Sequence, residues 1–217
     1  ILIVTLISKF TFGGWVTVVI TSFVILICLL VKKHYHFVFK KLHDMDLLMT
    51  STPPKTPVAL TPLQPNEATA VVMVGEHRGI GLHNLLWILR TFPNHFKNFI
   101  FVSVGIVDVE SFSAKKELTT MQENTNEMLD YFVNDCQQQG LAAKGFAAYG
   151  TDPTEKLTRL SKKIIKEFPH SLFFASKLIF SKDNWITRLL HNETAVMLQR
   201  RLHLLGVQLV ILPMKID

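Results

Sequence analysis

The chain has 217 residues, 48% of them hydrophobic, which is enough for a modest membrane portion and one soluble domain; we expect two domains at most. The formal net charge is +6, but residues 1–66 hold six Lys and Arg against two Asp, so +4 of it lies beside the first apolar segment. That position favours a membrane surface over a nucleic acid, which would need a basic stripe on the folded domain itself. Two cysteines exclude a disulfide framework.

An uncharged apolar run near the start has the length of a membrane span. Residues 15–31 read WVTVVITSFVILICLLV, and Trp15 and Tyr35 bracket the run. Twenty helical residues cover about 30 Å, the thickness of a bilayer core, and aromatic side chains favour its two interfaces. The sequence therefore predicts a full transmembrane helix over about residues 15–35.

The charges on either side of this run predict its orientation. Four lysines follow it: Lys32, Lys33, Lys40 and Lys41. Only Lys9 precedes it, so the positive-inside rule places the carboxy-terminal part of the chain in the cytoplasm. The expected location of the helix is the inner (plasma) membrane of the cell. Residues 1–7 are also apolar and are interpreted as the tail of a preceding span. We therefore expect a piece of a longer protein, with the rest of a membrane bundle and membrane lipids as partners.

The segment after the span leaves two alternatives open. Val38, Leu42, Met45 and Met49 recur at helical spacing beside lysines, which suits a helix in the lipid headgroup region or a simple continuation of the span. A proline-rich stretch then predicts an extended linker. The expected parts are the end of a transmembrane bundle with a juxtamembrane helix (residues 1–49), the linker (50–66) and a cytosolic domain (67–217).

Beyond the linker, apolar runs alternate with helical patterns, which is typical of parallel βαβ units. The expected strands cover residues 69–75, 99–105, 142–149, 172–180 and 207–213, and the expected helices about residues 80–92, 114–139, 154–168 and 186–205. Right-handed crossovers then give an α/β fold with a doubly wound parallel five-stranded sheet, flavodoxin-like or universal-stress-like. Ligands of such folds bind at the carboxyl ends of the strands.

Two of the expected helices have unusual surfaces. Residues 85–89 (LLWIL) leave almost no polar face on the first helix, and we expect a homodimer partner or the core of the membrane bundle to cover it. In residues 154–168 one face is basic, with Lys156, Arg159, Lys163 and Lys166. This face suits contact with anionic lipid or simple solvation, and both alternatives stay open.

A glycine-rich turn follows the first expected strand and opens a helix. It reads GEHRGIG over residues 75–81, and the free amides of a helix N-terminus together with an arginine suit a phosphate. The spacing matches neither the dinucleotide fingerprint nor the P-loop, and a tight turn without a ligand explains the glycines equally well. The candidate ligand-binding residues are Gly75, His77, Arg78, Gly79, Gly81 and Asp108. Asp108 follows the second strand, and its alternative role is to cap or orient the loop there.

The sequence contains no pattern typical of an enzyme or of a metal site. His77 and His191 lack the spacing of metal ligands, and no nucleophile motif is present. We expect no catalytic residues, no metal and no resident cofactor, with a nucleotide or cyclic dinucleotide as the one ligand class to consider.

Several segments together resemble the carboxy-terminal end of permeases in the amino acid/polyamine/organocation superfamily. They are KFTFGGWVTVVIT, LLVKKHYH, AVVMVGEHRGIGLHNLL, FPNHFKNFIFVSVGIVD and LLHNETAVMLQRRLHLLGVQLVILP. The resemblance implies a secondary transporter of roughly twelve helices with a universal-stress-like cytosolic tail, often dimeric, that regulates or assembles. Phe12 departs from the family pattern, which has an acidic residue there.

Three hypotheses are left for the cytosolic domain. It is a regulatory domain that senses a nucleotide or a ligand-free dimerisation module, and the third, less favoured alternative is a stand-alone nucleotide-binding or hydrolytic enzyme domain. Universal stress proteins that bind ATP carry a G-x-x-G-x9-G-S/T pattern after the fourth strand, whereas SKLIFSKDNWITRLLHNETA contains no glycine. ATP binding by that route is therefore not expected, and the transported substrate and coupling ion stay open.

Overall fold

A long helix and a sheet-based unit make up the described part of the chain. The computed structural model describes residues 14–49, 61–75, 77–106, 114–180 and 194–216. By its internal contacts the chain divides into two compact units, Ile1–His43 and Asp44–Asp217. The tail of the preceding span predicted for residues 1–7 and most of the linker lie outside the described residues.

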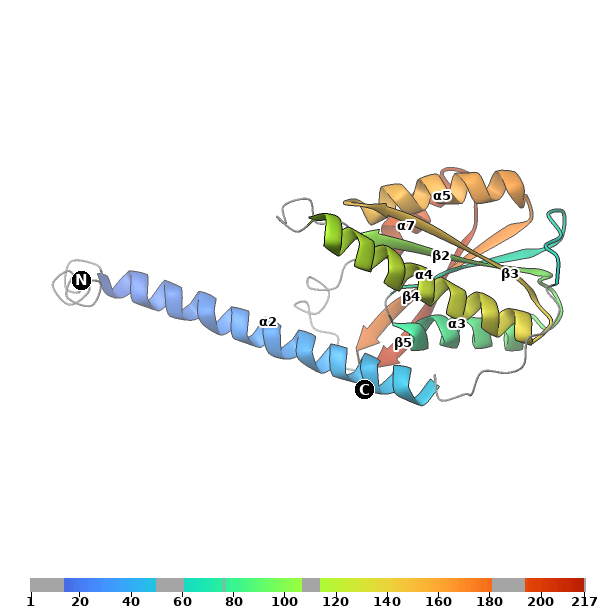
Figure 1. Cartoon of the computed structure of the whole chain (residues 1–217). Coiled ribbons are helices and arrows are strands. Elements are labelled where there is room, and N and C mark those ends of the chain that lie inside the picture. Colours follow the sequence, from blue (N-terminus) through green and yellow to red (C-terminus); the bar gives the residue numbers. More distant parts are fainter. Residues whose placement is uncertain (1–13, 50–60, 76, 107–113, 181–193, 217) are drawn as a thin grey trace. The chain divides into compact units, whose positions relative to one another are not determined.

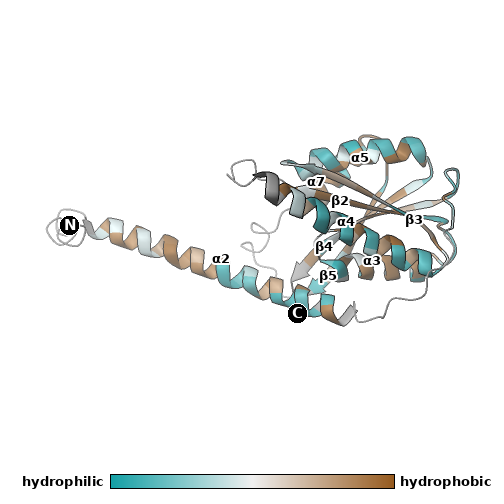
Figure 2. Cartoon of the chain, viewed as in Figure 1, coloured by the Kyte–Doolittle hydropathy of each residue, from teal (hydrophilic) through white to brown (hydrophobic). Residues whose placement is uncertain are grey.

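Helix α2 runs without interruption over Gly14–Met49. Within it, Trp15–Asp44 has the length and composition needed to cross a membrane. Its large apolar side chains are exposed, among them Phe23 and Leu30, and Figure 2 shows the apolar residues giving way to polar ones toward the end of the helix. Of the two alternatives for residues after the span, the continuous helix is the one observed.

The second unit is built on five strands. These are β1 (Thr69–Met73), β2 (Asn98–Ile106), β3 (Ala142–Gly150), β4 (Ser171–Phe180) and β5 (Leu209–Ile216). Four helices accompany them in the described residues: α3 (Arg78–Thr91), α4 (Ala114–Gln138), α5 (Pro153–Glu167) and α7 (Thr194–His203). All neighbouring strands are parallel, in the order β3-β2-β1-β4-β5. The predicted doubly wound five-stranded sheet is confirmed, and its order differs from the flavodoxin order 2-1-3-4-5.

Helices cover both faces of this sheet, α3 and α4 on one and α5 and α7 on the other (Figure 1), and an apolar cluster lies under each pair. On one face, Leu85 of α3 and Phe132 of α4 pack against Val72 and Phe101. On the other, α5 and α7 contribute a second group of buried side chains: Ile164, Phe168, Leu198 and Leu202. Crossovers between parallel strands are right-handed as a rule, so reversing the direction of travel after β3 moves the next helices to the opposite face.

Helices α4 and α7 end in the same backbone arrangement. In each, a glycine with positive φ, Gly140 or Gly206, follows the last turn. The next residue donates its N–H to a carbonyl five residues back, Leu141 to Cys136 O and Val207 to Leu202 O, each at 3.0 Å. This is the Schellman arrangement, in which glycine adopts φ > 0 without steric cost.

The described end of the linker is fixed to the sheet. The Thr61 hydroxyl donates to Gly140 O at 3.0 Å. The buried side chain of Asn98 accepts from Gln64 N at 2.8 Å and donates to Gln64 O at 2.7 Å. These bonds satisfy backbone groups just before β1 and define where the chain enters the sheet.

We expect Gly81→Ala to destabilise the α/β unit. A Cβ at this position would meet the buried ring of Phe132 and would lie 2.9 Å from Val74 Cγ1, so α3 would have to move away from α4. Such overpacking costs about 1–3 kcal/mol, which exceeds the gain in helix propensity from alanine. Denaturant unfolding measures the change. Gly75→Ala is the control, because nothing lies within 4 Å of its Cβ, and equal stability of both variants would contradict the packing role.

Candidate functional site

The strand order locates the edge where a ligand is expected. From β1 the chain continues toward β2 and β3, whereas from β4 it continues toward β5, and β1 and β4 are neighbours. The carboxyl ends of these two strands are therefore the topological switch point, the usual ligand crevice of open α/β sheets. Its described part is the turn from β1 into α3, because the residues after β4 (181–193) lie outside the described residues.

The predicted turn residues gather at the start of α3. Gly75 is exposed just after β1, His77 is the N-cap, and Arg78, Gly79 and Gly81 form the first turn. The His77 side chain makes no capping hydrogen bond, and the first turn contains no acidic residue. Gly81 faces Phe132 and is explained by packing. Asp108 and His191 lie outside the described residues.

A carboxylate from α2 caps this helix in place of a local side chain. The Gly79 N–H donates to Asp46 Oδ1 at 2.6 Å, and His77 Nδ1 lies 3.3 Å from Asp46 Oδ2. Asp46 belongs to the same compact unit as the sheet. The side chains of His77 and Asp46 are only 21% and 22% exposed, so the carboxylate is partly shielded from water. An anion is favourable here because a helix N-terminus presents free N–H groups and the positive end of the helix dipole.

A positive charge lies on the same turn. The Arg78 guanidinium carbon is 5.0 Å from the ring centroid of Tyr131 in α4, a cation–π arrangement. Burial raises the pKa of the Tyr131 phenol, Asp135 and Asp46 raise it further, and Arg78 opposes them. Tyr131 therefore stays protonated at neutral pH and can donate a hydrogen bond, while Arg78 supplies the cation of the site.

A polar pair joins α3 to β4. Asn84 is fully buried, and its amide nitrogen donates to the Oγ of the half-buried Ser176 at 2.6 Å. The other amide atom, Oδ1, has no hydrogen-bond partner among the described residues. A buried polar atom without a partner is costly, so the hydrogen bond to Ser176 is the one that offsets the burial of this side chain.

Sequence reasoning missed Asp46, Tyr131 and Asn84. Asp46 is separated from Gly79 by 33 residues, and no local pattern connects them. One signal was available, since α3 begins without a capping side chain and without an acidic first turn. Such a helix start needs an acceptor from elsewhere.

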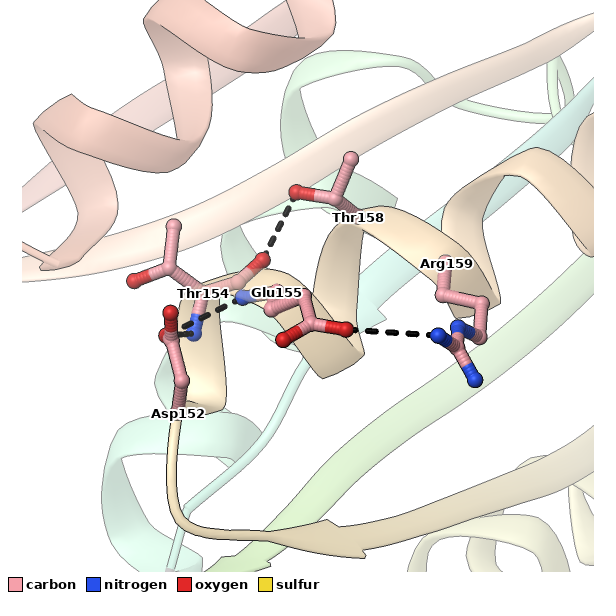
Figure 3. Close-up of polar contacts among 5 residues, drawn as sticks. All are labelled: Asp152, Thr154, Glu155, Thr158 and Arg159. Carbon is pink, nitrogen blue, oxygen red and sulfur yellow. Dashed lines mark hydrogen bonds and ion pairs between the residues drawn. The ribbon is translucent and has the colours of Figure 1, made fainter.

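Helix α5 shows the ordinary solution to the same problem (Figure 3). Asp152 Oδ1 accepts from Thr154 N at 2.8 Å and from Glu155 N at 3.1 Å, and Pro153 follows the cap. One residue of its basic face, Arg159, pairs with Glu155 at 3.3 Å, both exposed. The cap and the exposed ion pair are explained by helix stability alone.

Within the described residues, no group of three His, Cys, Asp or Glu side chains is arranged to hold a metal ion. Cys136 is fully buried in the α3–α4 cluster, and burial raises the pKa of its thiol far above the usual value. A thiol in that state is a weak nucleophile, so Cys136 is a core residue.

Comparisons with known proteins add a structural neighbour and no family. No family model matches the chain, and no curated protein matches it. A solved structure of a universal stress protein family protein from Arabidopsis thaliana, with AMP bound, aligns with 69% of this chain and 92% of its own, at 11% identity and a TM-score of 0.44. A likeness of this degree assigns no ligand to the present chain.

We expect Asp152→Ala to lower the free energy of unfolding by about 1 kcal/mol, because two N–H groups at the start of α5 lose their acceptor. Denaturant titration of the full chain in detergent measures the change. Asp130→Ala removes the same charge from the exposed surface of α4 and should change stability by less than about 0.5 kcal/mol. Equal losses in the two variants would mean that charge, not capping, is responsible.

Proposed function

We propose that this chain is the last transmembrane helix and cytosolic regulatory domain of a secondary transporter, an amino acid or cation permease. The observation that carries the proposal is α2, whose apolar stretch exposes its large side chains and which continues unbroken into residues of the α/β unit. A helix of this kind is stable when lipid covers it. At 36 residues it is about 54 Å long, so it extends well beyond a bilayer core of about 30 Å.

The ligand that we propose for the domain is a nucleotide whose phosphate binds at the start of α3. Supporting this are the N-terminal amides, the cation of Arg78 and the position of this turn at the switch point. The phosphate loop usual in universal stress proteins is missing from this sequence, so the α3 turn takes over that role. Tyr131 of α4 offers a further polar group beside Arg78.

A ligand-free dimerisation module is the alternative function. On α3, Leu85 and Ile88 are buried by the domain itself, whereas Leu86 is 47% exposed. Trp87 and Leu89 are partly buried against the same cluster. Less apolar surface of α3 is thus free than its sequence predicts, and single exposed leucines are common on monomers, which favours the sensing function.

We propose that the domain regulates and does not catalyse a reaction. Asp46 is engaged with the backbone of α3, and Cys136 is buried in the core. A general base paired with an activated nucleophile, the arrangement that enzymatic turnover would need, is not formed by these groups.

A nucleotide should raise the melting temperature of the full chain in detergent. At 100 times its dissociation constant a ligand stabilises the folded state by about 2.7 kcal/mol. ATP, AMP and a cyclic dinucleotide form the panel, and Arg78→Ala should abolish the shift. Arg90→Ala, at the exposed far end of α3, is the matched control and should keep it. No shift with any nucleotide, with the chain folded, would favour the dimerisation module.

The orientation of the membrane helix is tested separately. Protease added to intact cells that carry the full chain should spare residues 61–217, and permeabilised cells should lose them. Replacing Lys32, Lys33, Lys40 and Lys41 with glutamine should make the orientation mixed, because these charges favour the cytoplasmic side. Cleavage of the α/β unit in intact cells would contradict the proposed topology.

A further inference from the structure

The amide that a phosphate would use at the start of α3 already binds an anion. Gly79 N–H donates to Asp46 Oδ1 at 2.6 Å, and His77 Nδ1 lies 3.3 Å from Asp46 Oδ2. Both contacts involve groups to which we assign the nucleotide phosphate. Asp46, in the last turn of α2, therefore occupies the position of the ligand's charge.

The two anions cannot share this position. A backbone N–H makes one well-aligned hydrogen bond, and here the carboxylate takes it at short distance. A phosphate brought beside the partly shielded carboxylate would also be repelled, since like charges interact strongly where water is partly excluded. Binding of the phosphate therefore requires the carboxylate to leave.

We propose that Asp46 is an internal competitor of the nucleotide, so that ligand binding releases the last turn of α2 from α3. This proposal rests on the nucleotide-sensing function above and names its regulation. Because the coupling is reciprocal, anything that draws Asp46 away from Gly79 also raises the affinity for the nucleotide. The ligand would thus act on the cytosolic end of the proposed membrane helix by exchanging one anion for another.

A purely structural cap makes the opposite prediction. If Asp46 only stabilised the start of α3, removing its charge would loosen the turn and weaken ligand binding. If Asp46 competes, removing its charge strengthens binding. The sign of the change therefore separates the two roles.

The decisive variant is Asp46→Asn in the full chain in detergent. Asparagine keeps the size of the side chain, remains a good N-cap and can still accept from Gly79, but it carries no charge. The variant replaces the charge-assisted hydrogen bond between Asp46 and the Gly79 N–H with a weaker, neutral one. Because the competitor is then weaker, ATP should bind about tenfold more tightly in calorimetric titration. Inorganic phosphate, titrated in parallel, should tighten by a similar factor. Asp44→Asn is the matched control, because Asp44 is exposed two residues earlier, and it should change affinity less than about twofold.

Hydrogen exchange of residues 44–49 provides a second readout. ATP should speed exchange there in the wild-type chain. In Asp46→Asn, exchange without ATP should already be faster than in the wild-type chain, because the neutral bond to Gly79 is weaker, and ATP should speed it further at a lower concentration. Unchanged or weaker ATP binding by Asp46→Asn, with binding still lost in Arg78→Ala, would overturn the competition and leave the sensing function standing. If neither ATP nor phosphate binds the wild-type chain or Asp46→Asn, and the nucleotide panel gives no melting shift, the sensing function fails and the competition fails with it.

Discussion

Burial of the central strand on both faces is the constraint on which the α/β unit depends. Residues 70–72 of β1 are fully buried, with Val71 in one apolar cluster and Ala70 and Val72 in the other. A parallel sheet is stable when helices cover both faces, so the chain must reverse its direction of travel once to place helices on each side. That reversal puts β1 beside β4 and creates the switch point at their carboxyl ends. The position of the candidate site is thus a consequence of hydrophobic packing.

The sheet could be predicted because its strands are continuous apolar runs, but the last strand shows where such reasoning fails. The prediction for β5 was residues 207–213, whereas the strand covers Leu209–Ile216. It starts late because Val207 N–H closes the end of α7. It continues through Pro213 because β5 is an edge strand paired only with β4, where a missing N–H is tolerated. Pro213 therefore does not mark the end of this strand.

The candidate site was predictable only in part. Gly75 to Gly81 are adjacent in sequence, so glycine content and charge marked the turn. Asp46 and Tyr131 come from other helices, and a contact across such separations depends on how whole elements pack, which no local spacing encodes. The structure also gives different roles to two glycines that the sequence pattern does not distinguish. Gly81 is required by the close approach of Phe132, whereas the Gly79 backbone carries the polar contact.

Because α2 is one continuous helix, the number of residues in it determines the direction of the side chains at its end. Between Trp15 and Met49 the helix contains neither proline nor glycine, so nothing in it favours a kink. Each residue turns a helix by about 100°, so the number of residues between the apolar stretch and Asp46 sets the angular direction in which its carboxylate points. Inserting one residue in that interval would rotate the carboxylate by more than a quarter turn relative to the apolar stretch, whereas inserting seven would nearly restore its direction. Length variation in this segment is therefore expected to come in steps of whole helical turns.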